Sequence, residues 1–289
     1  MSARFRPTLW PGTVIVPPRL RPLPDVEVDG DWILWRIAPP RLDPVELPTD
    51  FYLHELLDTK PDDLEAVAAL VHAYGPLFDI NREDLDIETR DRLHDVPQEP
   101  DDDTGYWRAG HHRREVEVHL TEAHEAIQTW LALQTDGGLE ALVEAEVGPA
   151  QLEQFHLDNP EDLRFPEEPV TPEDLREMMV AARISNLKSV LNAALSKFSI
   201  GIDGIDDRYA TVYSVSFLQL YNHMAEDATV RHCLNEPCRR PFVRQRGRAA
   251  FGQNRTEGLK YCSRECARAQ AQRELRRRRR TTTNNNADS

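Results

Sequence analysis

Apolar residues recur at helical spacing in several stretches of the chain, and segments rich in proline or acidic residues separate these stretches. In 62–76, the apolar positions from Leu64 to Val71 fall on one face, and Gly75 and Pro76 end the pattern. The same periodicity predicts further helices over 114–134, 139–147 and 211–227. The chain is therefore expected to be mainly α-helical.

The clearest helix start lies at Thr171. Its side chain can cap the helix, Pro172 fits the first helical position, and Glu173 and Asp174 place negative charge at the positive end of the helix dipole. Apolar positions then recur to about residue 198. These features predict one long amphipathic helix.

Other segments have the composition of strands and connections. Residues 1 to about 57 are rich in proline, and the apolar runs 13–16 and 31–37 predict short strands. Three further segments are predicted as a loop, an acidic connector and a turn: 95–105, 157–170 and 201–207. Together the patterns predict that residues 1–230 form an acidic, mainly helical domain of unknown role with minor β structure.

The bulk composition indicates a soluble globular protein. Hydrophobic residues make up 40% and charged residues 29% of the 289 positions, and no apolar run approaches the roughly 18 residues of a membrane span. Prolines interrupt the N-terminal segment before it reaches the length of a signal peptide. The expectation is a cytoplasmic protein with no membrane partner.

Charge is distributed very unevenly. Residues 231–280 contain 16 Lys or Arg and four Glu, a net charge of +12, whereas residues 1–230 have a net charge of −26. Such a basic end favours a polyanionic partner, with nucleic acid first, and it also permits intramolecular contact with the acidic domain.

All four cysteines lie in this basic segment, as the pairs Cys233 and Cys238 and Cys262 and Cys266. Two close pairs separated by a loop are what four thiolates need to surround one tetrahedral Zn²⁺, and a closed shell of four sulfurs makes the ion structural. Disulfides and an iron–sulfur cluster remain alternatives, and neighbouring His232 is expected not to be a ligand.

The spacing of the second pair has a local reason. If Ser263 caps a helix, Cys262 lies just before that helix and Cys266 in its first turn, so both sulfurs can point to one side. The pattern C-x4-C, a basic loop, YCSREC and an arginine-rich helix resembles the treble-clef finger of bacterial CGNR zinc-finger proteins, although Ala267, Arg268 and Ala269 stand where that family has Gly, Asn and Arg.

The resemblance covers residues 231–280 and implies that the four cysteines are zinc ligands in a transcription regulator with a helical N-terminal region. The fold class expected for the whole chain is therefore mainly α with minor β, plus a small C-terminal treble-clef-like zinc finger. Residues 281–289 are low in complexity and are expected to form a disordered tail.

The helix after Ser263 is expected to contact nucleic acid through its arginines, mainly at phosphates. Four of them follow i, i+3, i+4, i+7 spacing from Arg273, which predicts a shared face. The candidate contact residues are Arg264, Arg268, Arg273, Arg276, Arg277 and Arg280. Phe242 and Phe251, in the basic loop, are expected to pack in the finger core rather than to stack on bases.

A second group of chemistry-bearing residues contains His111, His112, His119 and His124 with Glu115 and Glu122. Their spacing matches no metal-binding motif, so solvated helix side chains are expected. The sequence contains neither a glycine-rich phosphate loop nor a nucleophile elbow, and no enzyme activity is predicted. The leading hypothesis is a zinc-finger DNA-binding transcription regulator. The alternatives are a protein-interaction module that docks an acidic partner or its own acidic domain, and an RNA-binding protein.

Overall fold

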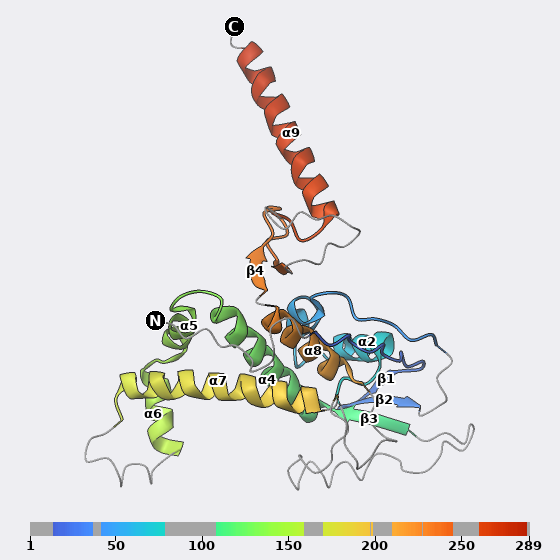
Figure 1. Cartoon of the computed structure of the whole chain (residues 1–289), viewed down its shortest axis with the longest axis vertical. Coiled ribbons are helices and arrows are strands. Elements are labelled where there is room, and N and C mark those ends of the chain that lie inside the picture. Colours follow the sequence, from blue (N-terminus) through green and yellow to red (C-terminus); the bar gives the residue numbers. More distant parts are fainter. Residues whose placement is uncertain are drawn as a thin grey trace. The chain divides into compact units, whose positions relative to one another are not determined.

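The computed structural model describes residues 14–36, 42–78, 108–158, 170–196, 198, 210–226, 228–244 and 260–287 (Figure 1). The chain divides into two compact units, formed mainly by residues 15–221 and 222–289. The sequence suggested a boundary between 230 and 231. This division falls in the last turn of helix α8 (Val212–Ala225), a few residues before the suggested boundary.

The first unit is mainly helical, as the sequence predicted. Its helices are η1 (Phe51–Leu53), α1 (Glu55–Asp58), α2 (Leu64–Tyr74), α4 (Arg113–Ala132), α5 (Gly138–Glu146), α6 (Pro149–Asp158), α7 (Pro172–Ser196) and α8 (Val212–Ala225). The helix α6 was not predicted. The loop and turn expected at 95–105 and 201–207 lie outside the described residues, as does most of the connector at 157–170.

A three-stranded antiparallel sheet accompanies these helices, in the order β1 (Glu27–Asp29), β2 (Trp32–Arg36) and β3 (Arg108–His112). The strand β2 confirms the prediction for 31–37. Residues 14–16 of the other predicted strand are not in β structure, and β3 was not expected. Gly110 of β3 lies so close to β2 that an added Cβ would stand 2.8 Å from the Ile33 carbonyl oxygen.

The predicted helix ends are confirmed. The helix α2 stops at Gly75, whose φ of 103° suits glycine. At the start of α7, the Thr171 hydroxyl accepts the Asp174 N–H at 3.2 Å, while an Asp174 carboxylate oxygen accepts the Thr171 N–H at 2.8 Å. Reciprocal bonds of this kind satisfy N–H groups that the helix itself leaves unpaired.

The helix α8 is buried along almost its whole length. Every residue from 211 to 223 is buried, and this explains its apolar, β-branched sequence. Its first N–H groups bond to the carbonyl oxygens of Pro76 and Leu77, at 3.0 and 2.8 Å from Val212 and Tyr213. The segment after α2 therefore caps α8 and ties residues distant in sequence into one core.

The second unit contains the antiparallel hairpin of β4 (Thr229–His232) and β5 (Pro241–Arg244), followed by the helix α9 (Arg264–Ala287). Phe242 on β5 is buried, as expected for a residue of the finger core, whereas Phe251 lies outside the described residues. The sequence predicted a disordered tail from 281, but α9 continues to Ala287. Extension costs little once a capped helix has been nucleated.

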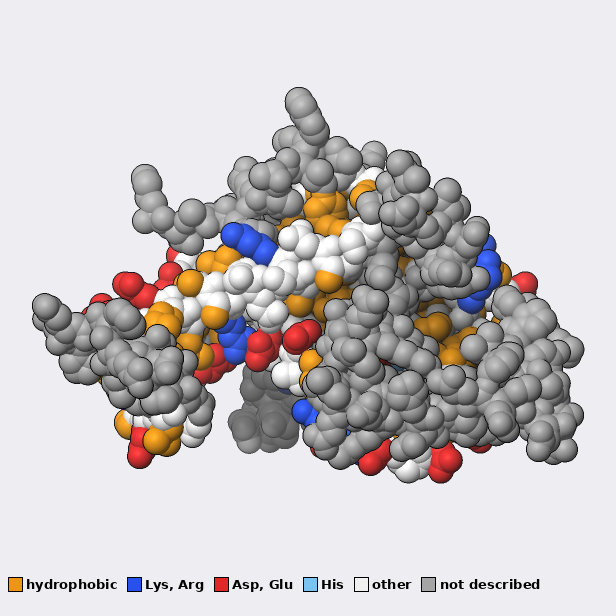
Figure 2. Space-filling view, turned by 90° about the horizontal axis from the view of Figure 1, so that it is seen from below, with side chains coloured by type: hydrophobic (Ala, Val, Ile, Leu, Met, Phe, Trp, Pro, Cys, Tyr) orange, Lys and Arg blue, Asp and Glu red, His pale blue; other side chains and the backbone are white. Residues whose placement is uncertain are grey.

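The surface differs between the two units. In the first, the described part of the face in Figure 2 shows apolar side chains together with both acidic and basic ones. In the second, exposed arginines dominate α9. Within the part of the chain that the structure describes, no helix combines the length and the apolar character needed to cross a membrane.

Candidate metal centre

The first cysteine pair lies in the tight turn that joins β4 to β5. The Cys233 N–H bonds to the Arg240 carbonyl at 2.9 Å and so continues the hairpin ladder past the end of β4. The Cys238 N–H bonds to the Asn235 carbonyl at 2.8 Å, and Arg239 takes a positive φ of 50°. We call residues 233–240 the knuckle. Its folded backbone turns both sulfurs to the same side.

The second pair comes from the start of α9. The Leu234 N–H bonds to the Lys260 carbonyl at 2.8 Å, which brings this segment against the knuckle. Ser263 caps α9 as predicted, because its hydroxyl accepts the Cys266 N–H at 3.2 Å. Cys262 therefore stands just before the helix and Cys266 in its first turn. A hairpin knuckle facing a helix N-terminus is the treble-clef-like arrangement that the sequence predicted.

The four sulfur atoms form a compact cluster, all within 4.8 Å of one another. The Cys238 and Cys262 sulfurs are 3.7 Å apart, and those of Cys262 and Cys266 are 3.5 Å apart. Four sulfurs at about 2.3 Å from one tetrahedral ion would stand about 3.8 Å from each other. A disulfide would need about 2.05 Å. The cysteines are free thiols in a geometry that can hold one metal ion.

Burial and hydrogen bonding differ among the thiols. Cys233 is fully buried, and the other three are partly exposed. A hydrogen bond from the Asn235 side chain lowers the pKa of Cys266 to about 7, whereas burial raises the pKa of Cys262 above its usual value. Asn235 thus favours the thiolate form, which is the form that binds metal.

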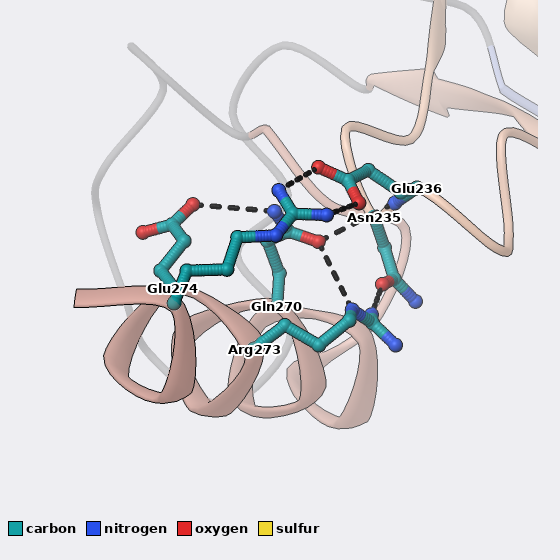
Figure 3. Close-up of polar contacts among 6 residues, drawn as sticks. Asn235, Glu236, Gln270, Arg273 and Glu274 are labelled. Atoms are coloured by element: carbon teal, nitrogen blue, oxygen red, sulfur yellow. Dashed lines mark hydrogen bonds and ion pairs between the residues drawn. The ribbon is translucent and has the colours of Figure 1, made fainter. Parts of the chain in front are cut away.

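A network of polar side chains joins the knuckle to α9 (Figure 3). The Arg273 guanidinium donates to the side-chain oxygens of Asn235 and Gln270. The Gln270 side-chain oxygen also accepts the backbone N–H of Glu236 at 3.4 Å, and its amide donates to Glu274 at 3.3 Å. Asn235 and Gln270 are both buried, whereas Glu236 and Glu274 are exposed, so the network runs from the interior of the finger to its surface.

Arg277 and Glu236 extend the network with a two-pronged ion pair. The two guanidinium nitrogens of Arg277 lie 2.7 and 2.5 Å from the two carboxylate oxygens of Glu236. This hydrogen bonding lowers the pKa of Glu236 and raises the pKa of Arg277. Bidentate geometry orients both groups, and together with the bonds of Arg273 it directs this side of α9 toward the knuckle.

The predicted nucleic-acid contacts therefore have different environments. Arg273 and Arg277 lie on the knuckle side of α9 and bond to it. Of these two, Arg273 is half-buried and Arg277 is exposed, as are Arg264, Arg268 and Arg276. The side chain of Arg280 lies outside the described residues.

The histidine group at 111–124 does not match its prediction. His111 and Glu115 were expected to be solvated, but they are 0% and 3% exposed. The reason is β3, which pairs His111 with Ile33 of β2 and turns its ring into the core, against Trp35 and Phe78. The Leu77 N–H donates to His111 Nε2 at 3.2 Å, which ties the ring to the segment that follows α2.

The other three histidines also have structural contacts. His112 caps α4 by accepting the Arg114 N–H, His124 bonds to the Leu56 carbonyl at 2.9 Å, and His119 packs on Phe78. Among the residues that the structure describes, the four cysteines are the one group of three or more ligand-type side chains close enough to share a metal ion.

Sequence reasoning missed three residues of the finger, namely Asn235, Glu236 and Gln270. The sequence did contain a signal for two of them. Asn235 and Glu236 lie between Cys233 and Cys238, so their side chains are close to the sulfurs of that pair. Gln270 follows Cys266 by one helical turn and so shares its side of the helix. Their partners could not be inferred without the geometry of the knuckle.

No protein-family model matches the chain, and comparisons with curated proteins and with solved structures give no significant match. The functional interpretation therefore rests on the geometry of the site and on its charge.

Proposed function

We propose that the cysteine cluster binds one structural Zn²⁺ and that the finger it stabilises binds DNA, as part of a transcription regulator. The main support is one observation: a highly basic helix begins at the cysteine cluster and carries exposed arginines. Zinc suits four thiolates in a tetrahedral arrangement, and a closed shell leaves no open position for catalysis.

Electrostatics supports the nucleic-acid partner. The finger segment carries a net charge of +12, and α9 has 24 residues, about 36 Å of helix along which arginines can follow several phosphates. Contacts of this kind release counterions from DNA, which makes affinity depend strongly on salt.

The test is DNA binding by the zinc-loaded full chain, measured by fluorescence anisotropy on a mixed-sequence duplex. With four phosphate contacts, affinity should fall about a hundredfold between about 50 and about 200 mM salt. Arg268→Ala should weaken binding and reduce the salt slope by about one. Arg19→Ala removes the same charge from an exposed site in the first unit and serves as the matched control. Salt-independent binding, or none, would refute the proposal.

A second candidate function is the docking of an acidic protein segment. The Glu236–Arg277 ion pair favours it, because an arginine of α9 already binds a carboxylate there. The acidic partner could be another protein or the first unit of this chain, whose residues include most of the −26 charge of 1–230. Competition separates the candidates. Polyglutamate should displace DNA only weakly if phosphates are the preferred partner, whereas equal displacement at matched charge would favour docking.

A further inference from the structure

The helix α9 has two sides with different contacts. Cys266, Gln270, Arg273 and Arg277 follow one another at offsets of 4, 7 and 11 residues, which places them on one side. All four interact with the cysteine cluster or the knuckle. This side holds the finger together and is the inner face of α9.

The opposite side carries a different set of residues, which we call the outward row: Arg264, Arg268, Gln272, Leu275 and Arg279. Their offsets from the first are 4, 8, 11 and 15 residues, so they fall on one face of the helix. All five are exposed, and Leu275 is 49% exposed.

The order of residues in this row is informative. Arg268 and Arg279 are separated by 11 positions, about 16 Å along the helix, and the positions between them on the row are the uncharged Gln272 and Leu275. A major groove is about 12 Å wide, so two arginines this far apart can reach the phosphates on its two edges. The uncharged pair would then face the floor of the groove.

Gln272 and Leu275 have the chemistry to read bases there. A glutamine amide can pair with both major-groove atoms of adenine, its N6 donor and N7 acceptor, and an apolar side chain can contact the methyl group of thymine. An exposed leucine gains nothing from a purely electrostatic phosphate contact. Its place in the middle of the outward row is explained if it meets an apolar group.

We propose that the outward row of α9 lies in the major groove of duplex DNA, with Arg268 and Arg279 on phosphates and with Gln272 and Leu275 against base edges. This inference rests on the proposed function and specifies its target. It selects DNA over duplex RNA, whose deep, narrow major groove does not admit these side chains. The bonds of Arg273 and Arg277 to the knuckle set the rotation that presents the outward row.

The first experiment selects binding sites for the zinc-loaded full chain from a random duplex DNA pool. An enriched motif containing A·T pairs is expected. Gln272→Ala and Leu275→Ala should each reduce the preference for this motif over random DNA by about tenfold, because one base contact is lost. Affinity for random DNA should change by less than about twofold, since no phosphate contact is removed. Leu234→Ala truncates another exposed leucine, in the knuckle, and should leave the preference unchanged.

The second experiment assigns each contact. Replacing thymine by uracil in the motif removes the methyl group, and this should weaken the unmodified protein but leave Leu275→Ala unaffected. Replacing adenine by 7-deazaadenine should weaken the unmodified protein but leave Gln272→Ala unaffected. Each variant should remain sensitive to the other base change, which separates a base contact from general damage to the finger.

The outcomes are distinguishable from those of the proposed function. Salt-dependent binding with no enriched motif would overturn the proposed base contacts of the outward row, and so would single-stranded DNA that competes as well as duplex DNA. Either result would still agree with a finger that binds phosphates. Absence of salt-dependent binding to any nucleic acid would overturn both.

Discussion

Arg277 of α9 and Glu236 of the knuckle form a bidentate ion pair, with nitrogen–oxygen distances of 2.7 and 2.5 Å. The two residues are 41 positions apart in sequence and come from opposite halves of the finger. Together with Arg273 and Asn235, they attach α9 to the hairpin beyond the point where the cysteines hold it. The helix is therefore fixed at two places along its length.

Exchanging the charges of Glu236 and Arg277 tests whether their ion pair attaches α9 to the knuckle. Glu236→Arg places two cations together and should speed metal release to a chelator by about two- to threefold, a small effect because exposed ion pairs contribute little. Glu236→Arg combined with Arg277→Glu should restore the original rate. If the double variant released metal as fast as the single one, the pair would not couple the knuckle to α9.

Asn235→Ala should weaken metal binding more strongly, by about tenfold, because it removes the hydrogen bond that stabilises the Cys266 thiolate. Competition with a chromophoric chelator measures this affinity. Leu234→Ala changes the adjacent, 47% exposed residue and provides the control, for which no change is expected. Equal affinity in both variants would contradict the role assigned to Asn235.

Cys262→Ser should abolish stoichiometric metal binding, because three sulfurs no longer close the shell. The finger should lose its ordered hairpin and the start of α9, whereas the first unit, which contains no cysteine, should keep its thermal transition. Elemental analysis and calorimetry measure the two effects. One retained zinc per chain would refute the ligand assignment.

The pH dependence of stability should reveal the cap at the start of α7. Hydrogen bonds from Thr171 lower the pKa of Asp174 below its usual 3.8, so the ionised carboxylate is stabilised in the folded state. This contribution is fully present above the unfolded pKa and is lost as pH falls through the folded one. The difference in melting temperature between the unmodified protein and Asp174→Asn should therefore shrink below about pH 4. A constant difference would contradict this role.

Two substitutions in α4 test which of its faces is buried. Leu120→Ala removes a fully buried side chain and should lower the free energy of unfolding by about 2 to 5 kcal/mol. Val118→Ala truncates a 49% exposed side chain on the same helix and should change stability by less than about 0.5 kcal/mol. Denaturant titration measures the free energy of unfolding of both variants. Similar losses of stability would contradict the assignment of Leu120 to the buried face of α4.

Local signals predicted the helices well because they depend on neighbours in sequence. The positions of Gly75, Thr171 and Ser263 indicated where α2, α7 and α9 end or begin, and all three are confirmed. The cysteine spacing likewise predicted a shared site. Caps and close cysteine pairs need only a few adjacent residues, so the sequence contains most of the information about them.

Long-range contacts could not be predicted in the same way. The burial of His111 follows from the pairing of β3 with a strand far away in sequence, which no local pattern indicates. The division of the α9 arginines into two sides also depends on where the knuckle lies. The i, i+3, i+4, i+7 rule placed Arg273 and Arg277 together, but it could not show that Glu236 would face them.

The confinement of every thiol to one cluster ties the shape of the finger to the redox state of its surroundings. A two-electron oxidation that joined any two of these cysteines would draw their sulfurs to about 2.05 Å and leave only two thiols able to bind a metal ion. The helix would lose its anchor, while the acidic unit, without a thiol, would stay folded. An oxidising environment would therefore disrupt the second unit and spare the first.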